Sequence, residues 1–133
     1  TSASIGAVHA GRAGALSAIL PKTIMAMQST FGACVENMKI VLGPSIGGCC
    51  YEINSSIAAV VREKGYENAL RYEEESFFLD VNTILLTQLH SIGIRHDQIG
   101  RIGECTACRN DTYFSYRADD QHTGRIAGVI MLR

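Results

Sequence analysis

The chain has 133 residues, 47% of them hydrophobic, and a formal net charge of −1. This length suits one domain, over residues 1–133, with enough apolar sequence to form a core. The balanced charge excludes the basic excess typical of nucleic-acid-binding domains, and no apolar run has the length of a membrane span. Five cysteines, an odd number in a chain of ordinary size, predict reduced thiols and a cytoplasmic protein rather than a disulfide framework.

A histidine follows the first apolar stretch. Residues 5–8 read as a short buried strand, and His9 stands at its end, before a turn that contains Gly11 and Gly14. A polar side chain at a strand end, followed by glycines that permit close approach, is a common way to build a binding site. The local pattern by itself favours a hydrogen-bonded core histidine, and the binding-site interpretation of His9 is the alternative at this point.

Helical periodicity begins at Leu16 and predicts a helix that ends near Phe31, with Gly32 as a left-handed cap. Pro21 lies inside this stripe. Since proline costs about 3 kcal/mol in a helix interior, we expect a kink there or a true helix start near Leu20.

Two more helices have clear beginnings. Asn54 or Ser55 is a candidate N-cap for a helix whose inward residues would be Ile57, Val60 and Val61. Asp80 is the candidate N-cap of a second helix, closed by Gly93. Its predicted buried face consists of Val81, Ile84, Leu85, Leu89 and Ile92.

The remaining apolar runs read as extended segments, at residues 38–42, 76–79, 99–102, 112–116 and 125–132. Strands and helices alternate at first, but no helix separates the last strands. This mixture predicts an α+β fold, a layered sandwich of a mixed β-sheet with packed helices, rather than a doubly wound fold. Because a buried-type strand comes first and strands are few for so much apolar sequence, we expect the N-terminal part of the domain to lie upstream.

Four cysteines form two pairs, Cys49–Cys50 and Cys105-x-x-Cys108. Together they could supply four thiolates to a zinc ion, and the second pair has ligand spacing. Adjacent cysteines rarely bind one ion together, so free, half-buried thiols are the simpler prediction. A redox role of the C-x-x-C pair is the remaining alternative.

Anion binding has two weaker candidates. The loop at residues 43–48, Gly-Pro-Ser-Ile-Gly-Gly, could present backbone N–H groups to an anion, although it matches no phosphate-binding fingerprint. Arg117 and Arg125 flank an acidic loop and could clamp a phosphate or carboxylate. Pairing of either arginine with Asp119 or Asp120 is the simpler expectation.

Four segments, in order, resemble the motifs of one family. They are VHAGRAG at residues 8–14, LGPSIGGCCYEI at 42–53, FLDVNTILLTQLHSIGI at 78–94 and ECTACRNDTYFSYRADDQHTGRIAGVIML at 104–132. The chain thereby resembles the C-terminal half of the laccase-domain, or polyphenol-oxidase-type, proteins. These are described as multifunctional purine nucleoside phosphorylases with adenosine deaminase activity.

The resemblance implies a metal site of two histidines and one cysteine, with zinc as the metal and copper as an alternative. His9, in the V-H-A-G motif, would be one ligand. The other histidine and the cysteine lie upstream in the family, so none of the five cysteines here should take that role. We therefore expect residues 1–133 alone to hold no zinc tightly and to be inactive.

The implied substrates are a purine nucleoside and phosphate, with no nucleic-acid or membrane partner. One departure affects this implication, since Arg12 and Ala13 stand where the family has Trp-Arg. Three alternatives follow from the resemblance: a diverged, non-catalytic interaction or regulatory domain, a copper-dependent polyphenol oxidoreductase, and a cysteine hydrolase. The last would need a cysteine beside His9.

Overall fold

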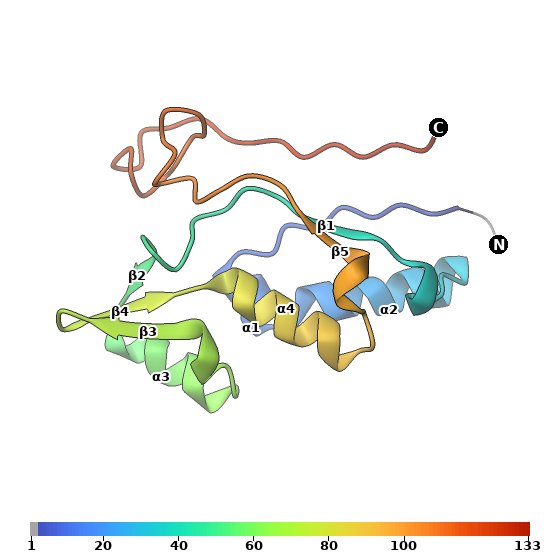
Figure 1. Cartoon of the computed structure of the whole chain (residues 1–133), viewed down its shortest axis with the longest axis horizontal. Helices are drawn as coiled ribbons and strands as arrows, with labels where there is room; N and C mark the ends of the chain where they lie inside the picture. Colours follow the sequence, from blue (N-terminus) through green and yellow to red (C-terminus); the bar gives the residue numbers. More distant parts are fainter. Residues whose placement is uncertain (1–2) are drawn as a thin grey trace.

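A computed structural model describes residues 3–133 as a mixed arrangement of helices and two small sheets (Figure 1). The helices are α1 (Arg12–Leu16), α2 (Ile19–Phe31), α3 (Ser55–Glu63) and α4 (Val81–Ser91), with 3₁₀ turns η1 (Val35–Asn37), η2 (Glu67–Ala69) and η3 (His96–Gln98). The strands are β1 (Ile40–Leu42), β2 (Glu52–Ile53), β3 (Leu70–Glu73), β4 (Ser76–Leu79) and β5 (Ile99–Arg101). This is the α+β class that the sequence predicts. None of the helices within residues 3–133 combines the length and hydropathy of a membrane span.

The two sheets differ in direction. β2, β4 and β3 form an antiparallel sheet in that order, whereas β1 and β5 pair in parallel, with Ile40 opposite Ile99. Parallel strands run to the same edge, so the chain leaves β1 and β5 side by side. The pairing continues beyond the strands, because Ile102 N donates to Leu42 O at 2.9 Å and Thr106 N donates to Ser45 O at 3.1 Å. Two loops far apart in sequence are thereby brought together.

Apolar side chains of the helices and strands form one core, and α4 contributes most to it. Its buried residues include Ile84, Leu85 and Leu89, as predicted. A buried amide ties this helix to its neighbours, since Gln88 Nε2 donates to Ala15 O at 2.8 Å and to Tyr66 Oη at 2.9 Å.

The predicted helix ends are largely confirmed. Asn54 Oδ1 accepts from Ile57 N at 2.9 Å, and Asp80 Oδ1 accepts from Asn82 N at 3.0 Å. The first helical stripe divides at Ala18, which adopts a left-handed conformation, so that α2 starts at Ile19. Pro21 then lies in the first turn, where its missing N–H has no intrahelical partner to lose.

The inward face predicted for α3 is wrong at one residue. Val61 and Ala58 are fully buried, but Val60 is 41% exposed. A step of one residue turns the chain by about 100° around a helix, so Val60 and Val61 cannot share one narrow buried stripe. α3 is therefore amphipathic, with a narrow buried face that consists of Ala58 and Val61.

Three predicted extended segments are not strands. Residues 5–8 and 125–132 are extended but unpaired within the described part of the chain, and residues 112–116 form turns. Ile5 and Val8 are each 38% exposed, and Val129 is 90% exposed. An apolar run becomes a strand only where another backbone completes its hydrogen bonds, and residues 3–133 supply no such neighbour to these segments. In Figure 1 both run on the β1–β5 side of the helices.

Side-chain hydrogen bonds, not helices or strands, organise the segment at residues 102–124. Asp119 is its hub, because its carboxylate accepts from Thr123 Oγ1 at 2.6 Å, Asn110 Nδ2 at 2.7 Å and Ser115 N at 3.2 Å. These donors favour the charged form and hold the pKa of Asp119 below its ordinary value of 3.8.

The two valines of α3 allow a matched test of the core. Val61→Ala removes two buried methyl groups and should lower the free energy of unfolding by about 1–3 kcal/mol. Val60→Ala makes the same chemical change at an exposed position and should stay within about 0.5 kcal/mol of the wild type. Urea denaturation of both variants measures the difference, and equal losses would contradict the burial described above.

A second prediction concerns acid. Because its folded-state pKa is depressed, Asp119 stabilises the fold above its ordinary pKa, and this contribution is lost as pH falls through the folded value. The protection factors of the amides at residues 110–124, which correct for the intrinsic pH dependence of exchange, should therefore fall below about pH 4. Asp119→Asn should show the lower protection already at pH 7, while Asp120→Asn, the exposed neighbour, should behave as the wild type. Identical pH profiles in all three proteins would refute this role.

Candidate functional site

His9 lies in the irregular segment that leads into α1 and is exposed to solvent. Gly11 makes room for its imidazole, since a Cβ on Gly11 would lie 3.1 Å from His9 Nε2. In the described residues the imidazole makes no hydrogen bond and is exposed, so the core-histidine interpretation that the local pattern favours is wrong. An irregular segment before α1, rather than the end of the predicted strand, positions His9.

Tyr51 contacts an arginine that follows His9 and an arginine from the C-terminal part of the chain. Arg12 Nη1 donates to Tyr51 Oη at 3.4 Å, and the guanidinium carbon of Arg117 lies 5.4 Å from the centroid of the Tyr51 ring. Arg117 Nη1 also donates to Glu52 O at 3.2 Å. Two cationic side chains from opposite ends of the chain thus meet on one tyrosine, a juxtaposition suited to binding an anion.

The expected pairing of arginines with the acidic loop does not occur in the part of the chain that the structure describes. Asp119 is occupied by the hydroxyl and amide donors named above, and Arg117 turns to Tyr51 instead. Arg125 Nη1 donates to Thr123 O and Gly124 O, and its guanidinium lies 5.9 Å from the Tyr116 ring centroid. Neutral donors close to Asp119 along the chain satisfy the carboxylate without either arginine.

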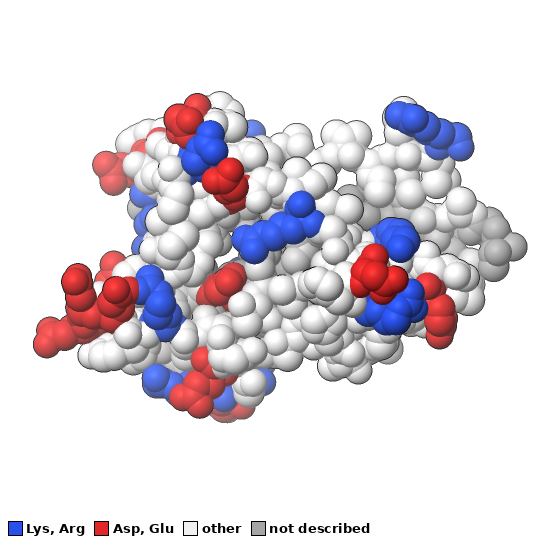
Figure 2. Space-filling view, in the orientation of Figure 1, with Lys and Arg blue, Asp and Glu red and all other residues white. Residues whose placement is uncertain are grey.

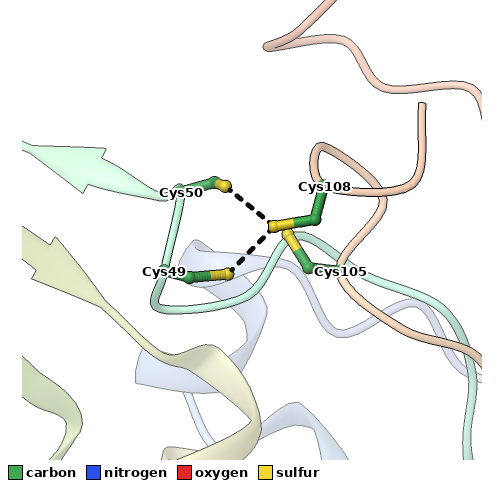
Figure 3. A group of neighbouring side chains, drawn as sticks. All are labelled: Cys49, Cys50, Cys105 and Cys108. Atoms are coloured by element: carbon green, nitrogen blue, oxygen red, sulfur yellow. Dashed lines mark hydrogen bonds between the residues drawn. The ribbon is translucent and has the colours of Figure 1, made fainter.

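Four cysteines converge where β1 and β5 end (Figure 3). Cys49 Sγ lies 3.5 Å and Cys50 Sγ 3.4 Å from Cys108 Sγ, and with Cys105 all four sulfurs lie within 4.8 Å of one another. The sequence predicts free thiols that do not share an ion, and the cysteines are free, but the argument that adjacent cysteines lie apart from the second pair does not hold. The parallel β1–β5 pair overrides that argument, since it places the two loops that carry the cysteines beside each other.

Gly47 completes this group, which we call the cysteine cluster (Cys49, Cys50, Cys105 and Cys108). Its backbone N–H donates to Cys105 Sγ at 3.2 Å, and a Cβ at Gly47 would lie 3.2 Å from Cys49 Sγ. The sequence allows the loop at residues 43–48 to present backbone N–H groups to an external anion. In the structure the N–H of Gly47 donates to Cys105 Sγ instead. The loop's role as a general anion cradle is not supported at Gly47.

The thiols of the cluster differ in acidity. Burial raises the pKa of Cys105, but the backbone N–H groups of Cys108, Gly47 and Ala107 outweigh it and lower the pKa to about 6. Burial and hydrogen bonding to Cys108 raise the pKa of both Cys49 and Cys50. Cys105 is therefore more acidic than Cys49 and Cys50.

The histidine–histidine–cysteine site that the resemblance implies is not assembled among residues 3–133. The cysteine cluster is the one group of three or more metal-ligating side chains in this range, and His9 is not a member of it. His9 fits the role of a single ligand because its imidazole is exposed and unbonded. A cysteine beside His9, which a cysteine hydrolase would need, is not seen either, since no cysteine of the described residues hydrogen-bonds to it.

Comparison with known proteins places this geometry in context. A purine nucleoside phosphorylase of Corynebacterium glutamicum is 35% identical over 128 residues, covering 96% of this chain and 50% of that protein. Purine nucleoside phosphorylase LACC1 of Mus musculus is 28% identical over 132 residues, covering 96% of this chain and 31% of that protein. The chain thus spans half or less of the length of these relatives.

Solved structures agree on the fold. The crystal structure of the hypothetical protein YfiH from Bacillus licheniformis superposes with a TM-score of 0.78 at 26% identity, over 88% of this chain and 45% of that one. A family model described as multi-copper polyphenol oxidoreductase laccase matches residues 1–133. Since that match extends over the whole chain, the protein belongs to the multi-copper polyphenol oxidoreductase laccase family.

Proposed function

We propose that the full-length protein is a metal-dependent purine nucleoside phosphorylase. In this reaction a phosphate oxygen bonds to the ribose C1′, the bond from C1′ to the purine nitrogen breaks, and the base leaves with a proton. Adenosine and inosine are the proposed substrates, with deamination of adenosine as a further activity. The names of the relatives that cover 96% of the chain support this class. The five free thiols fit a cytoplasmic location.

The exposed His9 is the observation on which this proposal depends most. Its imidazole is unoccupied by other residues of the described chain and stands at the surface, where ligands from elsewhere in the protein can join it. We assign it to a zinc ion, which would polarise the substrate or activate the attacking group. The other ligands lie outside residues 3–133, so the activity is proposed for the full-length protein and not for this chain alone.

Arg12 and Arg117 supply the phosphate-binding part of the proposal. Both guanidiniums reach Tyr51, and Arg12 follows His9 by three positions, so both arginines are candidates to hold an anion in the same region of the molecule. Arginine binds phosphate through paired, charge-assisted hydrogen bonds. Arg12 stands where the family has tryptophan and Ala13 where it has arginine, and we propose that Arg12 provides the cation that Ala13 cannot.

The Arg12–Ala13 departure also favours the second candidate, a diverged domain that keeps the fold without catalysis. Restoring the family residues with Arg12→Trp and Ala13→Arg separates the two. Phosphorolysis that appears only in the restored protein would support the non-catalytic domain, whereas turnover in the wild type supports the enzyme.

Replacement of His9 tests the metal-ligand role. His9→Ala should abolish phosphorolysis of adenosine and inosine by the full-length protein while its melting temperature changes little, because the side chain is exposed. His96→Ala, an exposed histidine of η3, is the matched control and should keep full activity. Activity per folded molecule and melting temperature are measured on the same samples. Normal turnover of folded His9→Ala protein would refute the assignment.

Replacement of Arg12 tests phosphate binding. Loss of a charge-assisted hydrogen bond costs about 1.5–3 kcal/mol, so Arg12→Ala should raise the KM for phosphate roughly tenfold to hundredfold. The KM for the nucleoside should change much less. Arg62→Ala, on α3, serves as the control. Steady-state kinetics with each substrate varied in turn gives the comparison, and an unchanged KM for phosphate would remove Arg12 from the site.

A further inference from the structure

We propose that the cysteine cluster binds one zinc ion at a structural site distinct from the metal site assigned to His9. The four Sγ atoms lie within 4.8 Å of one another. A tetrahedral zinc ion with Zn–S distances of about 2.3 Å places its sulfurs about 3.8 Å apart. Two of the contacts, at 3.4 and 3.5 Å, already approach that spacing, so small side-chain movements would complete the tetrahedron. This inference does not rest on the proposed phosphorylase activity.

The donor set selects both the metal and the kind of site. Four thiolates in tetrahedral arrangement suit zinc, whereas magnesium and calcium require oxygen ligands. Four protein ligands also leave no open position for water or substrate, which is the mark of a structural zinc site rather than a catalytic one. The cysteine cluster therefore takes no part in the chemistry proposed at His9.

The surroundings of the cysteine cluster resemble the outer shell of a metal site. The N–H of Gly47 points at Cys105 Sγ from 3.2 Å, and such donors orient and stabilise thiolate ligands. Gly47 is buried, and any side chain there would push against Cys49 Sγ and Cys105 Cβ, at 3.2 and 3.3 Å from its Cβ position. The loop therefore packs against the sulfurs only because this position has no side chain.

Zinc at this site would add a fixed point to a segment that is held by hydrogen bonds and by no helix or strand. Residues 102–124 contain neither helix nor strand, and they carry Arg117 to Tyr51. Cys105 and Cys108 anchor the start of this segment to the loop that bears Cys49 and Cys50, directly before Tyr51. The expectation from sequence, that these residues hold no zinc tightly, is replaced by one zinc per chain at this position.

Metal analysis of the full-length protein and its variants tests the site. Zinc content should fall by one ion per chain in Cys108→Ser and in Cys49→Ser, and should be unchanged in Cys34→Ser, an exposed cysteine outside the cysteine cluster. His9→Ala should retain this zinc, which separates it from the metal proposed for catalysis. Cobalt exchanged into the His9→Ala protein should show the intense sulfur-to-cobalt charge-transfer bands of a four-thiolate site, and these should disappear in the added presence of Cys108→Ser.

A rescue variant covers the case in which Cys108→Ser fails to fold. Cys108→His keeps a zinc ligand at the same position and should retain the ion, with the cobalt spectrum shifted to that of a site with three thiolates and one nitrogen. Equal zinc content in folded wild-type and Cys108→Ser protein would overturn the proposal. So would iron in place of zinc, or disulfides among the four cysteines in protein purified under reducing conditions. A full-length protein that binds this zinc but shows no phosphorolysis would refute the proposed function and leave the zinc site standing.

Discussion

The parallel pairing of β1 with β5 is the constraint on which the rest of the molecule depends. It is only a few residues long, yet it sets the direction in which both loops leave the sheet. Because the two strands end at one edge, the loop that carries Cys49, Cys50 and Tyr51 meets the loop that carries Cys105 and Cys108. An antiparallel pair would send these loops to opposite edges, and neither the cysteine cluster nor the contact of Arg117 with Tyr51 would form.

Buried amides support this arrangement from the other face. Gln98 Nε2 donates to Val35 O at 2.7 Å and to Met38 O at 2.8 Å, which fixes the approach to β1 against the approach to β5. Gln88 performs the same function between α4 and α1. Each amide donates to backbone carbonyls of a neighbouring segment, so these buried polar residues specify how the elements pack. The face in Figure 2 shows positive and negative side chains close together rather than one extended patch of either sign, as the balanced composition suggests.

Local features were predictable because their causes are local. The caps at Asn54 and Asp80, the helix start beside Pro21 and the buried face of α4 each depend on a few neighbouring residues. The cysteine cluster and the contacts of Tyr51 depend on which strands pair and in which direction, and periodicity carries no information on either. The strand predictions for the terminal segments were wrong for a related reason. An apolar pattern indicates that a segment can pair as a strand, but pairing also requires a neighbouring strand, and the sequence pattern does not show whether one is present. An irregular segment before α1, and not a strand, holds His9, and Gly11 lets its imidazole lie close to the backbone.

The separation of Ile40 from Ile99 along the chain also has a consequence for the order of folding. α3, the β3–β4 hairpin and α4 lie between them and are formed by contacts between near neighbours, which appear early. β1 and β5 join only after this intervening chain has become compact, since closing a long flexible loop carries an entropic cost. The pair Cys49–Cys50 and the pair Cys105–Cys108 therefore meet late. Before that, an oxidant meets two separate pairs of thiols, whereas in the folded protein it meets one cluster of four.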